Sequence, residues 1–84
     1  MVDQRELVTL NELSARLTSE LQEIEDCEGS EITVKYRLRE PDADGCNWSE
    51  DVSIRVGPNA TAEYLTPYVD SIVTRARAIF NVKD

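Results

Sequence analysis

Two stretches of the sequence, residues 31–39 and 48–56, alternate apolar and polar side chains, and they constrain the fold more than any other feature. Successive side chains of a β-strand point to opposite faces, so this alternation predicts two half-buried strands. The residues expected to face inward are Ile32, Val34, Tyr36, Leu38, Trp48, Val52, Ile54 and Val56. The acidic stretch between the runs, residues 40–48, carries an Asp-Gly turn, which predicts an antiparallel hairpin.

Charge restricts the register of this hairpin, because like charges placed opposite each other are destabilising. One favourable register pairs Arg37 with Asp51. A second pairs Lys35 with Asp51, and this same register places Glu31 opposite Arg55. Either of the two is compatible with the sequence.

A helix is predicted before the hairpin. Thr9 and Glu12 fit a capping box, in which each side chain binds the other residue's backbone N–H. We expect the helix to run to about Asp26, with Gly29-Ser30 supplying the left-handed stop. Its apolar stripe consists of Leu10, Leu13, Leu17, Leu21 and Ile24.

A second helix is predicted after the hairpin, capped by Asn59 or Thr61. Pro67 leaves two interpretations, because an interior proline deletes a backbone hydrogen bond but also suits the first position of a helix. The segment is either one kinked helix or a short turn followed by a helix that starts at Thr66-Pro67. The apolar face consists of Val69, Ile72, Val73, Ala76, Ile79 and Phe80.

The predicted fold is a single α+β domain covering residues 1–84, with a flexible N-terminus over residues 1–8. Its architecture is a two-layer α-β-β-α arrangement, an antiparallel β-hairpin covered on one face by two helices. This order resembles that of double-stranded-RNA-binding domains, which have three strands and a basic helix N-terminus. The present chain has two predicted strands and acidic residues in place of those bases, so no family or function is taken from the resemblance.

Composition excludes several classes of function. Seventeen acidic residues against nine basic ones give a net charge of −8, which repels nucleic-acid phosphates and anionic membranes. The sequence has no run of about 20 apolar residues and no secretion signal, so we expect a cytoplasmic protein with no membrane partner. With no His and two Cys, most metal and nucleophile chemistry is unavailable. We therefore expect no enzyme, no cofactor and no metal site.

The acidic loop is the predicted binding site. The helix and strand lengths match, which places this loop beside the C-terminal end of the second helix, at the opposite end of the fold from Cys27. Cys27 and Cys46 are thus expected to be free thiols, and a thiolate beside three carboxylates is disfavoured. The candidate partner-binding residues are Glu40, Asp42, Asp44, Trp48, Arg75 and Arg77.

The leading functional prediction is a small acidic, non-enzymatic protein-interaction module that acts through the hairpin-loop end, with Trp48 as an aromatic anchor for an unknown protein partner. One alternative is an inhibitor whose acidic run, residues 20–31, mimics nucleic acid and occupies a basic nucleic-acid-binding protein. Another is a weak divalent-cation loop, since residues 40–51 resemble a calcium loop. The loop can equally be a plain turn with no function of its own.

Self-association is also predicted. A two-stranded sheet is marginal by itself, and each strand of the hairpin has a free edge. Edge-to-edge pairing of two chains would form a symmetric homodimer with a four-stranded sheet.

Overall fold

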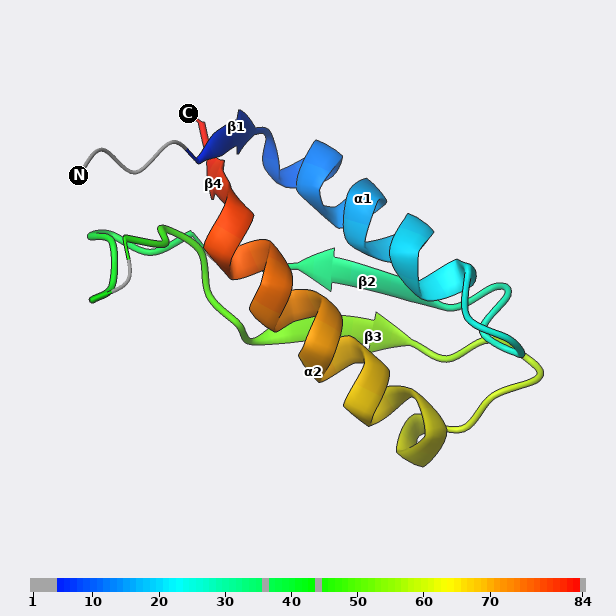
Figure 1. Cartoon of the computed structure of the whole chain (residues 1–84). Coiled ribbons are helices and arrows are strands. Elements are labelled where there is room, and N and C mark those ends of the chain that lie inside the picture. The colour runs from blue at the N-terminus through cyan, green and yellow to red at the C-terminus, as the bar shows by residue number, and fades with distance from the viewer. Residues whose placement is uncertain (1–4, 36, 44, 84) are drawn as a thin grey trace.

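The predicted order of helix, strand, strand and helix is found in the computed structural model, with one further strand at each end (Figure 1). The structure describes residues 5–35, 37–43 and 45–83. Its elements are β1 (Glu6–Val8), α1 (Leu10–Gln22), β2 (Glu31–Val34), β3 (Val52–Arg55), α2 (Ala62–Ile79) and β4 (Phe80–Val82). They make a small α+β fold with two separate two-stranded sheets, one antiparallel (β2–β3) and one parallel (β1–β4).

The hairpin adopts the second of the two favourable registers. Glu31 lies opposite Arg55 and Val34 opposite Val52, and the ion pair between Lys35 Nζ and Asp51 Oδ2 measures 3.8 Å. The expected strands are cut short because the register changes beyond Val34. An isolated bridge joins Arg37 to Trp48, so two residues on one strand face three on the other, as in a β-bulge. The inward placement expected for Tyr36 lies outside the described residues.

The first helix begins as predicted and ends earlier. Thr9 is the N-cap, and both hydrogen bonds of the capping box with Glu12 are present. The helix ends at Gln22 instead of Asp26. Asp26 itself takes a left-handed φ of 69°, and Gly29 follows with a φ of 85°, so the chain turns twice before β2. The leucines at 13, 17 and 21 are fully buried.

A polar stripe beside these leucines joins α1 to the outer edge of β2. Ser14 Oγ accepts a hydrogen bond from the Val34 N–H at 2.9 Å. The Thr18 hydroxyl accepts from the Ile32 N–H at 3.0 Å and donates to the Ile32 carbonyl at 3.1 Å. Gln22 extends the row to the backbone just before β2. Side chains of α1 therefore occupy the edge of β2 where another strand could have paired.

The second helix is one continuous element that contains Pro67 in its interior, so the interpretation of a short turn followed by a helix that starts at Thr66-Pro67 is wrong. Thr61 is the N-cap, and its hydroxyl accepts from the Tyr64 N–H at 3.1 Å. The helix ends at Ile79, because Phe80 is extended, with φ −114° and ψ 146°. Phe80 was expected on the helix's apolar face; it is buried, but as the first residue of β4.

The parallel pair β1–β4 joins the two ends of the described chain (Figure 1). Glu6 lies opposite Phe80 and Val8 opposite Val82. Residues 6–8, expected to be loose, thus form a strand, while residues 1–4 of the same expected segment lie outside the described residues.

The inward face of the second run is only partly covered. Trp48 is fully buried and Val52 half-buried, but Ile54 and Val56 are 39% and 40% exposed. The expectation that Ile54 and Val56 are buried in the core is therefore wrong, although Ile54 lies opposite the buried Ile32 and shares its face of the sheet. Helix α1 packs closely on β2, whereas α2 makes few contacts with β3 and leaves this part of the strand open.

The segments after α1 and after β3 meet at the end of the fold opposite the acidic loop, as expected from the element lengths. The Gly57 N–H donates to the buried Ser30 Oγ at 2.9 Å. A Cβ atom at Gly57 would lie 2.4 Å from the Glu28 carbonyl oxygen, so only glycine fits there. Neither of the two described helices is both long and apolar enough to cross a bilayer.

Candidate functional site

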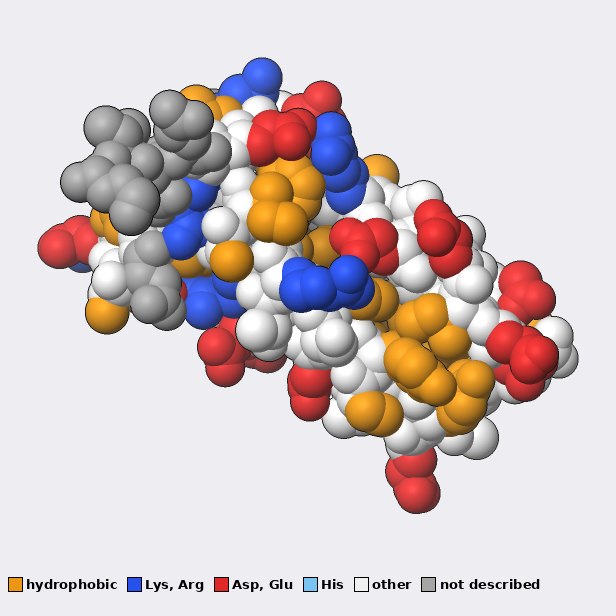
Figure 2. Space-filling view, in the orientation of Figure 1, with side chains coloured by type: hydrophobic (Ala, Val, Ile, Leu, Met, Phe, Trp, Pro, Cys, Tyr) orange, Lys and Arg blue, Asp and Glu red, His pale blue; other side chains and the backbone are white. Residues whose placement is uncertain are grey.

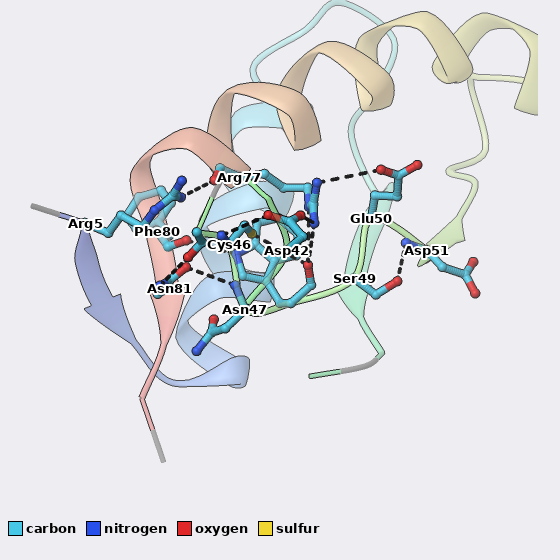
Figure 3. Close-up of polar contacts among 12 residues, drawn as sticks. Arg5, Asp42, Cys46, Asn47, Ser49, Glu50, Asp51, Arg77, Phe80 and Asn81 are labelled. Carbon is cyan, nitrogen blue, oxygen red and sulfur yellow. Dashed lines mark hydrogen bonds and ion pairs between the residues drawn. The ribbon is translucent and has the colours of Figure 1, made fainter. Parts of the chain in front are cut away.

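Reciprocal amide contacts fasten the acidic loop to β4 (Figure 3). The Asn47 side chain donates to the Val82 carbonyl at 2.8 Å and accepts from the Val82 N–H at 2.7 Å. The Asn81 side chain donates to the Gly45 carbonyl at 3.0 Å and accepts from the Asn47 N–H at 3.1 Å. The two asparagines thus replace the backbone bonds that a neighbouring strand would make.

Arg77, at the end of α2, clamps the same loop from the other side (Figure 3). Its guanidinium forms an ion pair with Asp42 and donates to the Trp48 carbonyl from Nε and Nη2, at 3.3 and 3.1 Å. A second carboxylate, that of Glu50, forms an ion pair in which Oε1 lies 3.7 Å from Arg77 Nη1. Burial by itself lowers the pKa of Arg77, but the hydrogen bond to Asp42 and the nearby carboxylates outweigh it and raise the pKa. Arg77 is a permanent cation that joins the loop to α2.

Trp48 belongs to the core. Its side chain is fully buried, and its indole Nε1 donates to the Phe80 carbonyl at 3.0 Å. The Arg77 guanidinium lies 5.9 Å from the centre of the Trp48 ring, within cation–π range. The ring contacts the chain's own residues, so its role in this structure is to hold the loop in place.

Both cysteines are free and buried. Burial, together with the charges of Glu28 and Asp26, raises the pKa of the Cys27 thiol. The Cys46 Sγ contacts the Trp48 carbonyl at 3.6 Å. The protonated thiol of Cys27 is a poor nucleophile at neutral pH.

The structure brings three of the predicted site residues together, Asp42, Trp48 and Arg77. Arg75 lies elsewhere: it pairs with Glu20 of α1 at 3.3 Å, away from the loop. Glu40 is exposed, and Asp44 lies outside the described residues. Among residues 5–35, 37–43 and 45–83, no group of three or more metal-ligating side chains could hold an ion.

An open groove of about 980 Å³ separates α2 from β3 and ends beside the loop. Its apolar lining comes from Val52 and Ile54 of β3 and from Val69 and Val73 of α2, and Arg77 lies at the loop end. The sequence pattern assigned all four of these residues to the core. Val69 and Val73 are buried there, but Val52 is only half-buried and Ile54 is exposed, because periodicity shows which face is apolar and cannot show how closely two elements approach.

The edge of β3 beside this groove is open. The N–H and C=O of a strand residue point to the same side, and those of Ile32 point toward α1. Ile54 lies opposite Ile32, and Val52 lies opposite Val34. The backbone groups of Val52 and Ile54 therefore point away from β2. No hydrogen bond to these outward groups is found among the residues that the structure describes.

Charges of both signs are interspersed on the face shown in Figure 2, where basic side chains lie next to acidic ones. Acidic side chains gather at the end where α1 stops, and the exposed residues there include Glu23, Glu25, Asp26 and Glu28. Two acids of the predicted acidic run are paired, Glu20 with Arg75 and Glu31 with Arg55.

No protein-family model matches the sequence, and no match is found among curated proteins or solved structures. The function must therefore be argued from the geometry. The surface between α2 and β3 offers backbone donors and acceptors in a row, an apolar wall and flanking charges. These are the components with which proteins bind an extended chain segment.

Proposed function

We propose that this chain is a small acidic, non-enzymatic protein-interaction module that binds an extended segment of a partner along the open edge of β3. One observation carries the proposal. Side chains of α1 bind the outer edge of β2, whereas Val52 and Ile54 direct their backbone groups outward from β3. An added strand gains main-chain hydrogen bonds from such an edge and specificity from pockets for its alternate side chains.

The groove determines what kind of segment fits. In this proposal both helices cover the apolar face of the hairpin, α1 over β2 and α2 across the groove from β3. A strand added to β3 then places every second side chain in the groove, against Val52 and Ile54. Its other side chains lie on the opposite face, beside Asp51 and Arg55. The matching segment has apolar residues at alternate positions and charged residues of both signs between them.

The loop predicted as the binding site forms the end of this surface. Arg77 lines the groove and also holds Asp42 and the Trp48 carbonyl. The loop would therefore set where the added strand stops, and Trp48 would contribute by fixing the loop and not by contacting the partner.

The alternative functions have less support. Nucleic-acid mimicry rests on the acidic run alone, and Glu20 and Glu31 of that run are paired with arginines. A cation loop would need Asp42, whose carboxylate already accepts from Arg77 and from the Cys46 N–H, the latter at 3.2 Å. Adding a strand to the open edge of β3 does not require such existing contacts to be broken first.

A display library of random short peptides, selected on the immobilised chain, tests the proposal. Selected peptides should alternate apolar and polar residues, and their binding should slow hydrogen exchange at the Val52 and Ile54 amides. Ile54→Lys should weaken binding, because an edge lysine opposes strand addition. Ile79→Lys, at a residue that is 50% exposed and outside the groove lining, is the matched control. Peptides that bind both variants equally would show that the site lies elsewhere.

A further inference from the structure

We infer that the segment added to β3 is β3 of a second copy of this chain, paired antiparallel about a two-fold axis that passes through Ser53. The inference rests on the proposed function, because it names the partner of the same strand edge. The two hairpins would form one four-stranded sheet, with the two copies of β3 at its centre.

The backbone allows this pairing only in certain registers. Val52 and Ile54 point their N–H and C=O groups outward, so outward groups of the two copies must face each other. With Ser53 opposite itself, Val52 of each copy lies opposite Ile54 of the other, and each such pair exchanges both of its N–H···O bonds. A shift by one residue would instead place Val52 or Ile54 of one copy opposite Ser53 of the other. The N–H and C=O of Ser53 point toward β2 of its own chain, so the hydrogen bonds between the two copies would be lost.

Charge selects one register from those that remain. With Ser53 at the axis, Asp51 of each copy lies opposite Arg55 of the other. Within one chain, Asp51 already pairs with Lys35 at 3.8 Å, and Arg55 pairs with Glu31 at 3.7 Å. Charges then alternate in sign across the whole sheet, in the order Lys35, Asp51, then Arg55 and Glu31 of the second copy. A shift by two residues places Asp51 or Arg55 opposite Ser53 and loses these pairs.

The apolar face fits the same register. Ile54 is 39% exposed, and Val52 is half-buried at the floor of the groove. In the dimer, Ile54 of the second copy lies beside Val52 on the face toward α2. The groove of about 980 Å³ has room for it. The partly exposed side chain of each Ile54 is thereby covered by a symmetric contact, and the most exposed strand edge of the hairpin is removed.

Charge reversal provides a specific test. Asp51→Lys sets two positive charges opposite each other in a homodimer, and Arg55→Glu sets two negative charges opposite each other. When the two variants are mixed, each interchain pair joins opposite charges again. Each single variant should therefore dissociate more readily, by on the order of tenfold or more. Their mixture should form a heterodimer close to the wild type in affinity.

Light scattering with size exclusion, at increasing micromolar concentration, measures the mass. The wild type and the Ile79→Lys control should approach twice the chain mass of 9.5 kDa. Circular dichroism checks that each variant remains folded, as expected for exposed residues. A wild-type mass that stays at 9.5 kDa overturns the inference. So does a dimer that tolerates both charge reversals, or variants that fail to recover when mixed.

The two proposals can fail separately. A monomer that still binds selected peptides at the β3 edge overturns the second-copy inference and leaves the proposed function standing. A monomer that binds no peptide overturns both. The wild-type dimer can also be compared with a charge-reversal variant that is monomeric. If the Val52 and Ile54 amides exchange hydrogen equally fast in both, the dimer interface does not include the edge of β3, and the inference is overturned.

Discussion

The hydroxyl of Thr18 on α1 binds both backbone groups of Ile32 on β2, accepting from its N–H at 3.0 Å and donating to its carbonyl at 3.1 Å. The Thr18 side chain thus makes the two hydrogen bonds to the edge of β2 that a neighbouring strand would otherwise make. Because both groups of Ile32 point to α1, those of Ile54 on the paired strand must point to the open edge. This contact explains why the two edges of one hairpin differ.

Replacing this hydroxyl should destabilise the fold. Thr18→Val keeps the shape of the side chain but leaves the N–H and C=O of Ile32 without partners, at a cost of about 1–3 kcal/mol. Urea denaturation at one fixed protein concentration measures the change, and the Ile32 amide should exchange faster. Thr33→Val is the matched control, because Thr33 is exposed on β2 and valine is a good strand residue. Equal stability of the two variants would contradict this role for Thr18.

Two arginines on α2 should respond differently to the same substitution. Arg77 is 18% exposed and donates to both Asp42 and the Trp48 carbonyl, whereas the side chain of Arg75 is 64% exposed in its pair with Glu20. A lysine cannot reproduce the forked contacts of Arg77, so Arg77→Lys should cost about 1.5–3 kcal/mol. Arg75→Lys should change stability by less than about 0.5 kcal/mol.

Fluorescence of Trp48, the single tryptophan, gives an independent measurement at the same site. Arg77→Lys should shift its emission toward that of exposed indole, because the contacts of Arg77 with the Trp48 carbonyl and ring are weakened. Arg75→Lys should leave the emission unchanged. If both variants behave alike, Arg77 does not clamp the loop.

Local patterns were enough to predict the hairpin and its helices. The capping box at Thr9 and Glu12 follows from residues close together in sequence. Charge pairing reduced the hairpin to two registers, and the one that places Glu31 opposite Arg55 is found. The parallel pair of β1 with β4 could not be predicted in this way. Each strand has three residues, too few for a visible alternation, and their pairing joins distant parts of the chain.

The site was harder to predict than the fold. Asp42 and Arg77 were correctly expected to lie close together, because element lengths fix which ends meet. Arg75 was placed with them, but two residues along a helix rotate the side chain to another face, where Glu20 binds it. The stripe of Ser14 and Thr18, four residues apart beside the leucines, was the available signal that α1 binds a strand edge.

Acid should weaken the start of α1. The hydrogen bond from the Thr9 N–H is the main cause that lowers the pKa of Glu12 below 4.5 in the folded chain. A carboxyl with a lowered folded pKa stabilises fully above its unfolded value, and this contribution is lost as the pH falls through the folded value. Glu12→Gln keeps an acceptor for Thr9 without a titrating group. The stability difference between wild type and variant should therefore shrink below pH 4.5.

Denaturant titrations of both proteins, from neutral pH downward, measure this difference directly. Using the difference removes the acid effects that the two chains share. A stability difference between wild type and Glu12→Gln that stays constant through this range, or grows in acid, would contradict the assigned contribution of Glu12.

Asn47 should tolerate even an isosteric change poorly. Its amide nitrogen donates to the Val82 carbonyl at 2.8 Å, and its oxygen accepts from the Val82 N–H at 2.7 Å. Asn47→Asp replaces the donor with a carboxylate oxygen that faces the carbonyl oxygen, so both the lost bond and the repulsion destabilise β4. We expect a loss of about 1–3 kcal/mol or more at neutral pH. Asn59→Asp, at an exposed position, is the control.

The pH dependence of this loss distinguishes the lost donor from general disruption. Repulsion from the Val82 carbonyl raises the folded-state pKa of the introduced carboxyl, so protonation is favoured in the folded chain. The protonated carboxyl can donate again, and the deficit relative to wild type should narrow as the pH falls through that raised pKa. Protection of the Val82 amide in the variant, which is its exchange rate compared with the intrinsic rate at each pH, should increase over the same range. If the deficit is the same at every pH, the donor to Val82 is not what holds the loop on β4.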